Sequence, residues 1–342
     1  MELSELQKKI VESNSDQVVV IASAACGKTH CLTERVRFWL RSGVPAAEIC
    51  AITFTKAAAD EMQMRLANDY KDGMFIGTIH ALAARCLVMS GQGNKVGKAI
   101  DEEAFDEFFQ YILEDPSCVL HYNYVLVDEA QDLSHDEYQF IFEMINPEHF
   151  FVVGDFRQNI YESLKGASAK YMLQLLNLPG VHKYDLNENY RNKANILNYA
   201  KRTLKRIRLE DNSIPMSVGG TVYEGRLDID KLVEWIEAEG QFKDWAILCY
   251  TNKEVGMIMR LLNENFIPVI NFNQKQKTKK QLDNLVNANK VKVLTVWCAK
   301  GLGFPHVVVY GRNWLAARKN PEGVRVDYVA YTRAMDSLMV LK

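Results

Sequence analysis

The segment Gln17-Val-Val-Val-Ile-Ala-Ser-Ala-Ala-Cys-Gly-Lys-Thr29 joins a β-branched run to a Gly-Lys-Thr sequence. Its first five residues favour a strand, and the apolar spacing of Thr29–Leu40 favours a helix directly afterwards. A strand, a small-residue loop and a helix in this order are typical of a P-loop. Ala22 stands where the usual pattern begins with glycine. This motif taken alone therefore leaves open a strand-to-helix turn that binds nothing.

A P-loop binds phosphate with backbone N–H groups and with the N-terminus of the helix that follows. Lys28 would neutralise the β- and γ-phosphates, and Thr29 would be a magnesium ligand. The predicted phosphate-binding residues are consecutive: Ala22, Ser23, Ala24, Ala25, Cys26, Gly27, Lys28 and Thr29.

A second motif, Tyr124-Val-Leu-Val-Asp-Glu-Ala-Gln-Asp132, lies well downstream. A hydrophobic strand that ends in Asp-Glu supplies a carboxylate for magnesium, here Asp128, and a neighbouring carboxylate that orients water. Glu129 would be the general base for that water. Acidic pairs at strand ends are common, but together with the upstream P-loop this pair indicates a nucleoside triphosphatase.

Strand-like and helix-like segments alternate along the chain, which is the pattern of parallel sheets covered by helices. The sequence therefore predicts an α/β fold with two lobes, residues 1–187 and residues 188–342. The expected strands are 17–21, 48–53, 124–127, 150–153, 182–186, 245–249, 291–296, 306–310 and 338–341. The expected helices are 29–40, 57–70, 136–144, 229–239, 253–265 and 326–333.

The composition is that of a soluble globular protein, with 48% hydrophobic and 25% charged residues among 342. No apolar run suits a membrane span, and the first residues do not resemble a signal peptide. The seven cysteines are scattered without a C-x-x-C pair, so we expect no zinc site, no disulfides and a reducing, cytoplasmic setting. A net charge of −2 argues against a globally basic surface for duplex DNA, and favours a local groove with stacking aromatics for single strands.

Two charged stretches lie outside these motifs. We interpret the basic stretch Lys201–Arg208 as a helix face in water. The polar run Gln274–Lys280 is interpreted as a solvated loop, with a contact to nucleic acid phosphate as the alternative.

Asp128-Glu-Ala-Gln-Asp132, with a P-loop that lacks its first glycine, resembles the superfamily 1 DNA helicases of the UvrD/Rep/PcrA type. The other motifs of that family follow in the expected order and cover almost the whole chain. They are Gln7, Ile52–Met62, Gly77–His80, Val153–Tyr161, Leu186–Arg191, Val293–Phe304 and Tyr328–Ala334. The resemblance implies two RecA-like P-loop lobes, in a minimal form without the usual large accessory insertions.

The resemblance also implies a role for each matching residue. Gln7 would read adenine, and Tyr190 would stack on it. Gln158 would sense the γ-phosphate, which Arg191 and Arg333 would reach from the second lobe. The implied catalytic residues are Lys28, Asp128, Glu129, Gln158, Arg191 and Arg333, with Mg²⁺ held by Thr29 and Asp128. The implied DNA contacts are Thr53, Phe54, His80, Tyr161, Thr295 and Trp297.

Several positions depart from the family pattern. Ser23, Ala25 and Cys26 stand where glycine, glycine and serine are frequent, which predicts a stiffer loop. Trp297 replaces a histidine, and is either a stacking partner for DNA or a packing residue. Gly303 stands where glutamate is usual. None of these changes removes a catalytic charge.

These features predict an ATP-dependent translocase or helicase that moves 3′ to 5′ on single-stranded DNA and hydrolyses ATP in the cleft between the lobes. ATP and Mg²⁺ are the expected cofactors. Single-stranded DNA is the expected partner, and RNA and protein partners in a repair, recombination or replication complex are left open. The alternatives are an ATP-binding regulatory or recruitment module with little turnover, and a motor subunit of a nuclease or repair complex.

Overall fold

The computed structural model describes residues 2–69, 73–102, 104–238, 241–272, 284–285, 287–317 and 320–342. The chain divides into two compact units, Met1–Ala22 with Gly27–Leu186, and Ser23–Cys26 with Asn187–Lys342. The loop residues Ser23–Cys26, which the sequence analysis placed in the first lobe, therefore group with the second unit. The predicted polar loop Gln274–Lys280 and the predicted helix ends Tyr70 and Glu239 lie outside the described residues.

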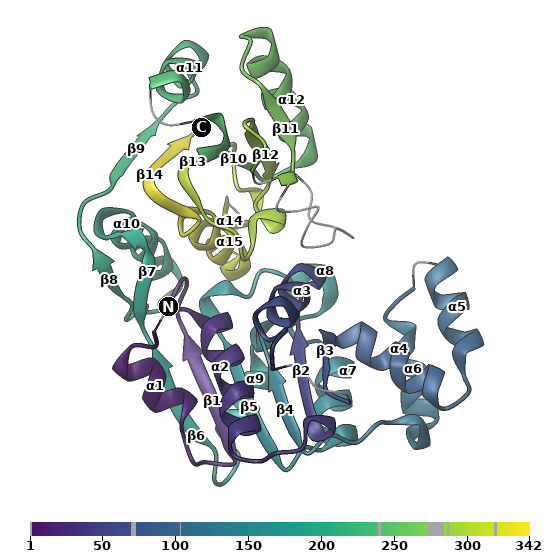
Figure 1. Cartoon of the computed structure of the whole chain (residues 1–342). Coiled ribbons are helices and arrows are strands. Elements are labelled where there is room, and N and C mark those ends of the chain that lie inside the picture. Colours follow the sequence, from purple (N-terminus) through teal and green to yellow (C-terminus); the bar gives the residue numbers. More distant parts are fainter. Residues whose placement is uncertain are drawn as a thin grey trace. The chain divides into compact units, whose positions relative to one another are not determined.

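The first unit contains a six-stranded parallel sheet in the order β3-β2-β4-β5-β1-β6 (Figure 1). Its strands are β1 Gln17–Ala22, β2 Ile49–Thr53, β3 Phe75–Thr78, β4 Tyr124–Val127, β5 His149–Gly154 and β6 His182–Leu186. Its α-helices are α1 Glu5–Val11, α2 Lys28–Arg41, α3 Lys56–Arg65, α4 Ile79–Met89, α5 Gly93–Asp101, α6 Glu107–Glu114, α7 His135–Tyr138, α8 Glu162–Lys165 and α9 Lys170–Leu176. The π-helical segment η4, Gln139–Ile145, continues α7, and short 3₁₀ turns include η3 Ala130–Asp132 and η5 Phe156–Gln158.

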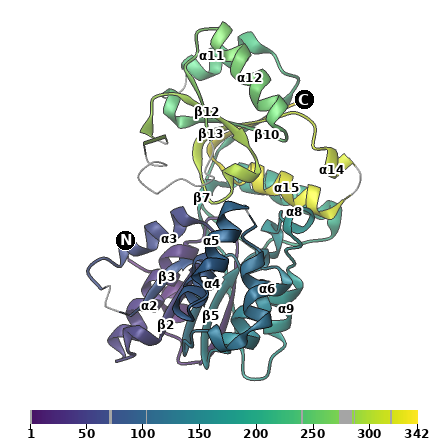
Figure 2. The ribbon, with the colours of Figure 1, turned by 90° about the vertical axis from the view of Figure 1, so that its right-hand side faces the viewer.

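Helices cover both faces of this first sheet. Figure 2 shows α2 and α3 on one side and α6 and α9 on the other. The second face is lined by alternate strand residues such as Val19, Val125 and Val152, which pack against α4, α6, η4 and α9. Burial of nearly every residue of the inner strands follows from this double cover.

The second unit contains another six-stranded parallel sheet, in the order β11-β12-β10-β13-β14-β9. Its strands are β9 Thr221–Gly225, β10 Trp245–Cys249, β11 Val269–Asn271, β12 Val291–Thr295, β13 Phe304–Tyr310 and β14 Ala334–Leu341. A separate parallel pair is formed by β7 Glu188–Lys193 and β8 Ile214–Ser217. The helices are α10 Ala194–Leu204, α11 Ile229–Ala238, α12 Asn252–Glu264, α14 Trp314–Ala317 and α15 Pro321–Tyr331, with 3₁₀ turns η6 Lys205–Ile207, η7 Phe242–Asp244 and η8 Trp297–Ala299.

The second sheet is also covered on both faces. Leu232, Ile236 and Ile258 from α11 and α12 pack on one face with Trp245 and Val293, and Figure 1 shows α15 on the opposite side. These two sheets confirm the predicted α/β fold with parallel sheets flanked by helices. Within the described ranges, no helix is long and apolar enough to cross a membrane.

Candidate functional site

The carboxyl ends of the parallel strands in the first unit lead into the predicted motifs. Strand β1 ends at Ala22 before the phosphate loop, β4 ends at Val127 before Asp128, and β5 ends at Gly154 before Asp155. In open parallel sheets, ligands bind at this edge. The fold therefore gathers these motifs of the first unit at one place.

The N-terminus of α2 has no side-chain cap. The helix begins at Lys28, its cap is Gly27 with a φ of 82°, and its first turn has no acidic residue. A glycine has no side chain to cap the first N–H groups, and N–H groups at the N-terminus of a helix are a common binding site for phosphate oxygens. The Gln7 side chain packs against Gly27, since a Cβ at Gly27 would lie 2.7 Å from Gln7 Nε2. The arrangement therefore fits a nucleotide phosphate.

The phosphate loop itself is held by residues of the second unit. Asn189 Nδ2 donates to Ala24 O at 3.0 Å, and the Tyr190 backbone N donates to Ala25 O at 3.1 Å. Ala25 has a φ of 60°, a left-handed conformation that favours glycine. These two hydrogen bonds stabilise a loop shape that the residue at position 25 disfavours.

Lys28 and Glu129 form an ion pair, with Lys28 Nζ 3.0 Å from Glu129 Oε1. Both side chains are largely shielded, with 10% and 16% of their surfaces exposed. Asp128 precedes Glu129, and its Oδ1 accepts a hydrogen bond from the Glu129 N–H at 2.9 Å. The structure therefore brings the predicted phosphate lysine to the predicted general base.

Gln131 connects this ion pair to the loop after β5. Its Nε2 donates to Glu129 Oε2 at 2.5 Å, and its Oε1 accepts from the Asp155 N–H at 2.8 Å. Asp155 Oδ2 in turn accepts from Gln158 Nε2 at 2.7 Å. A chain of polar contacts thus runs from Lys28 through Glu129, Gln131 and Asp155 to the predicted sensor Gln158. Gln131 is fully buried, as is Asp155.

Gly154 permits that connection. A Cβ at this position would lie 2.8 Å from Gln131 Oε1 and 2.7 Å from Met172 Sδ. The close approach requires glycine at the end of β5.

The predicted nucleotide residues of the second unit have different surroundings. Tyr190 is 48% exposed, and its hydroxyl donates to Glu188 Oε2 at 2.8 Å. The Arg191 side chain lies against Gly303, where a Cβ would approach Arg191 Nε to 2.7 Å. Arg333 is only 1% exposed, and its guanidinium donates to Val329 O and Leu302 O, each at 3.0 Å. In this structure Arg333 therefore braces the end of α15 within its own unit.

The two aromatic residues of the first unit that were predicted to contact DNA, Phe54 and Tyr161, pack against each other. The rings of Phe54 and Tyr161 have centroids 5.2 Å apart and planes tilted by 32°, and both are half-buried. Thr53, predicted as a polar contact, is 1% exposed and donates to Thr55 O at 3.1 Å. Its hydroxyl fixes the turn after β2 rather than facing solvent.

His80 lies on α4, and its Nε2 is 3.2 Å from Asp106 Oδ1. Its ring packs edge-on against Phe109, with centroids 5.2 Å apart. In the second unit, Thr295 ends β12 and Trp297 begins η8, and both are partly buried.

Sequence reasoning did not single out three polar residues that position the motifs within their own units: Gln131 in the first unit, and Asn189 and Asp211 in the second. Gln131 and Asn189 were quoted within motifs, but only their contacts reveal what they position. Asp211 lies in a segment without a motif, and its Oδ1 accepts from Ser23 Oγ at 3.3 Å. No sequence signal distinguishes Asp211 from an ordinary loop aspartate.

Two family models match this chain. The UvrD/REP helicase N-terminal domain matches residues 3–117 and 116–178, together more than half of the chain, and the UvrD-like helicase C-terminal domain matches residues 270–342. A putative ATP-dependent DNA helicase R568 of Acanthamoeba polyphaga mimivirus is 25% identical over 97% of this chain and 52% of its own.

Two relatives from Escherichia coli are similarly distant. DNA helicase II is 23% identical, covering 83% of this chain and 54% of its own length. The ATP-dependent DNA helicase Rep is 23% identical, covering 78% and 55%. The chain thus spans about half the length of the curated relatives it matches.

Proposed function

Because this chain belongs to the UvrD/Rep family of helicases, we propose that it is an ATP-dependent DNA motor that moves on single-stranded DNA. The observation that carries the proposal is the linked set Lys28, Glu129, Gln131, Asp155 and Gln158 at the carboxyl edge of the first sheet. This set joins a phosphate-binding lysine to a carboxylate base and to a loop that can report the state of the nucleotide.

Each residue has a defined part in the proposed reaction. In hydrolysis, the oxygen of water forms a bond to the γ-phosphorus, the bond to the β-phosphate oxygen breaks, and Glu129 takes the proton of the water. In this structure Lys28 forms an ion pair with Glu129. Binding of the phosphates would move Lys28 to a phosphate oxygen and release the Glu129 carboxylate for the water.

ATP and Mg²⁺ are the proposed cofactors. Thr29 and Asp128 are hydroxyl and carboxylate oxygen donors, the kind that Mg²⁺ prefers alongside phosphate oxygens. Bound magnesium would neutralise charge on the transferred phosphoryl group. Arg191 and Arg333 are proposed to act on the same group, and Arg333 would first have to leave its contacts with Val329 and Leu302.

The proposed DNA path uses Phe54, Tyr161, His80, Thr295 and Trp297. Stacking on aromatic rings is indifferent to sequence, which suits a motor that moves along any strand. The tilted Phe54–Tyr161 pair offers such a surface. Movement from 3′ to 5′ and hydrolysis in a cleft between the lobes are part of the same proposal.

The test is ATP hydrolysis in Mg²⁺, measured with and without single-stranded oligonucleotide. We expect DNA to raise the rate severalfold in the wild type and Lys28→Ala to abolish hydrolysis. Strand displacement on duplexes with either a 3′ or a 5′ tail then tests polarity, and we expect only the 3′ tail to support it. A rate that stays flat when DNA is added would contradict the motor.

A regulatory module with little turnover is the second candidate. In this phosphate loop Ala25 has a left-handed backbone conformation and Cys26 is fully buried, and neither residue is the one that is frequent at its position in the family. If this candidate is right, neither the wild type nor Lys28→Ala hydrolyses ATP. The variant must then bind DNA, and support any partner function, as well as the wild type does.

A further inference from the structure

The basic stretch Lys201–Arg208 is a sequence feature that the proposed function leaves unused. Five of its eight residues are basic: Lys201, Arg202, Lys205, Arg206 and Arg208. Lys201 and Arg202 lie in the last turn of α10, where cations stabilise the helix end, but the other three lie beyond it in η6 and its cap. The helix dipole therefore accounts for only part of this charge.

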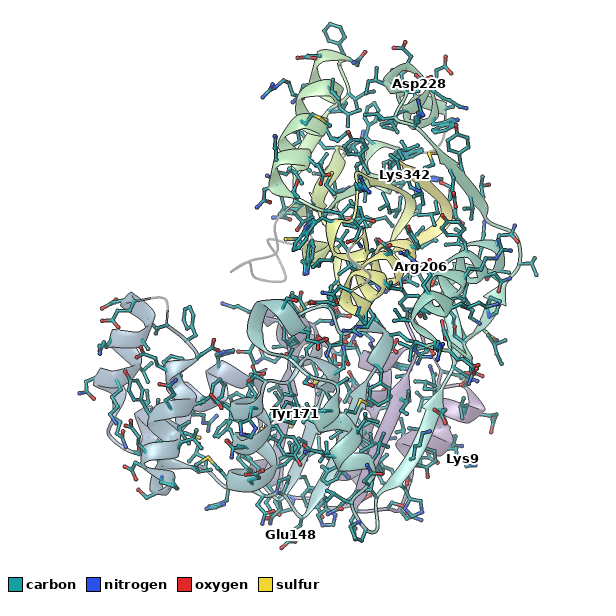
Figure 3. The ribbon with its side chains drawn as sticks, turned by 180° about the vertical axis from the view of Figure 1, so that it is seen from behind. Lys9, Glu148, Tyr171, Arg206, Asp228 and Lys342 are labelled. Atoms are coloured by element: carbon teal, nitrogen blue, oxygen red, sulfur yellow. The ribbon has the colours of Figure 1, made fainter. Side chains whose placement is uncertain are left out.

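Among the described residues the basic stretch forms few ion pairs, although Glu210 and Asp211 follow it directly in the sequence. Within the described part of the chain, its one ion pair joins Arg206 to Asp327, with a separation of 3.6 Å. Lys201 Nζ donates to the backbone oxygen of Ser213. Arg206, which belongs to this stretch, is labelled in Figure 3. Lys205 and Arg208 are exposed to solvent.

A cavity lies beside these cations, with a volume of about 430 Å³. Its lining residues are Lys201, Lys205, Arg208, Leu209, Glu210, Asp211 and Asn212. Arg208 has a φ of 55°, a conformation in which a non-glycine residue costs about 1 kcal/mol or more. This left-handed residue is the cap that ends η6.

One wall of the cavity is bonded to the phosphate loop. Asp211 Oδ1 accepts from Ser23 Oγ at 3.3 Å, and Asp211 Oδ2 accepts from the Tyr328 hydroxyl at 2.9 Å. A ligand in this cavity would therefore contact a residue that also contacts the loop proposed to bind ATP.

We propose that this cavity, defined by Lys201, Lys205 and Arg208, binds the phosphate backbone of single-stranded nucleic acid. Lys201 and Lys205 are one turn apart, about 6 Å along a helix axis, so they can contact neighbouring phosphates rather than a single one. In a protein with a net charge of −2, such a local array supplies the electrostatic attraction that the chain as a whole lacks. This inference rests on the proposed function, because it adds a contact for the same strand.

The test compares Lys205→Gln/Arg208→Gln with Lys253→Gln/Arg260→Gln. The control pair removes the same charges from exposed positions of α12 in the same unit. Binding of an oligothymidylate to the full chain is measured by fluorescence anisotropy over a series of salt concentrations. Circular dichroism melting verifies that both variants are folded.

We expect the slope of log K against log salt to lose about 1.4 in magnitude in the cavity variant, which is about 0.7 for each lost phosphate contact. The control should keep the slope of the wild type, and ATP hydrolysis without DNA should be unchanged in both. An unchanged slope in the cavity variant, with normal binding by the wild type, refutes this site and leaves the motor intact. A wild type that binds no oligonucleotide refutes both.

Competition by inorganic tripolyphosphate separates a small-anion site from a strand-binding site. We expect tripolyphosphate to compete weakly and about equally in the wild type and the cavity variant. If the variant loses only this competition and keeps the slope of the wild type, the cavity takes small anions and the nucleic-acid inference is wrong.

Discussion

Glu129 combines an unfavourable backbone with an essential predicted role. Its φ is 50°, and a left-handed non-glycine residue costs roughly 1–2 kcal/mol. The ion pair to Lys28 and the hydrogen bond from Gln131 hold the carboxylate in that position. Strain of this kind persists where the surroundings over-determine a conformation, and it is concentrated at functional sites.

We predict that Glu129→Gln slows ATP hydrolysis by roughly 10²–10⁴-fold, the usual contribution of a general base. ATP binding should persist or tighten, because the neutral amide no longer competes with phosphate for Lys28. Single-turnover hydrolysis and equilibrium binding of a fluorescent ATP analogue measure the two effects. Glu234→Gln, on the exposed face of α11, is the control. Weaker nucleotide binding in Glu129→Gln would count against this account of the ion pair.

Gly303 determines where the Arg191 side chain can lie. A Cβ there would come within 2.7 Å of Arg191 Nε and 3.0 Å of Arg191 Cδ. We predict that Gly303→Ala displaces the guanidinium and lowers kcat roughly tenfold or more, as expected when an arginine that stabilises the transition state is misplaced. Gly256→Ala, where the added Cβ meets nothing within 4 Å, should leave kcat unchanged.

The comparison uses steady-state ATP hydrolysis with saturating DNA, together with the melting temperature. Equal kcat values for Gly303→Ala and Gly256→Ala would show that Arg191 has no part in the slow step. A lowered melting temperature in Gly303→Ala alone would mark a packing defect instead.

At this scale the sequence predicts residue types better than contacts. The proximity of Lys28 and Glu129 could be expected, because both follow parallel strands whose carboxyl ends meet at one edge. The bridge through Gln131 could not, because a side-chain amide reaches two partners only once the chain is folded. Arg333 is instructive: the motif predicts its chemistry, yet its burial against Val329 and Leu302 depends on packing.

Strand β12 carries a buried cation that makes stability depend on pH. Lys292 is fully buried, and its Nζ donates to Lys243 O at 2.5 Å and to Ala288 O at 3.3 Å. Burial lowers the pKa of Lys292 to about 8. Above that pH the folded protein releases the proton while the unfolded chain, with an ordinary lysine pKa near 10.4, retains it. The contribution of Lys292 to stability therefore rises with pH between these values.

We predict that the free energy of unfolding of the wild type, relative to Lys292→Met, rises by roughly 2 kcal/mol between pH 8 and 10. Urea unfolding at several pH values measures it. Buried thiols act with the opposite sign, since burial raises the pKa of Cys86 to about 11, but they act equally in both proteins and cancel in the difference. A difference that does not change with pH would mean that Lys292 keeps its proton.

At the scale of helices and strands, the sequence predicts those elements whose apolar residues form a long run or a regular spacing, and it misses those whose apolar residues do not. The inner strands β1, β4 and β10 are continuous apolar runs, and they agree with expectation. Strand β3, Phe75-Ile-Gly-Thr78, was missed because its apolar run is only two residues long before Gly77. The predicted helix 136–144 is α7 followed by the π-helical η4, a change of hydrogen-bond pattern that apolar spacing does not reveal.

At the scale of the whole molecule, residues Ser23–Cys26 of the phosphate loop belong to a different unit from the elements on either side of them in the chain. Strand β1 precedes it and α2 follows it in the first unit, yet Ser23–Cys26 group with the second. The binding of nucleotide to the loop should therefore depend on residues that follow β6. Asn189 is the central one: it is fully buried, it holds Ala24 O, and its Oδ1 accepts from the N–H groups of Arg191 and Asn192.

We predict that Asn189→Asp weakens ATP binding about tenfold, because a carboxylate cannot donate to Ala24 O and leaves that oxygen without its partner, a loss of about 1–3 kcal/mol. Asn195→Asp is the matched control, since it removes a similar hydrogen bond, from Asn195 Nδ2 to Gly220 O at 2.8 Å, on the exposed surface of the second unit. Titration with a fluorescent ATP analogue gives both affinities, and urea unfolding separates loss of binding from loss of fold. If a folded Asn189→Asp binds ATP as tightly as Asn195→Asp, the loop keeps its shape without the hydrogen bond from Asn189, and the proposed dependence of nucleotide binding on residues that follow β6 is wrong.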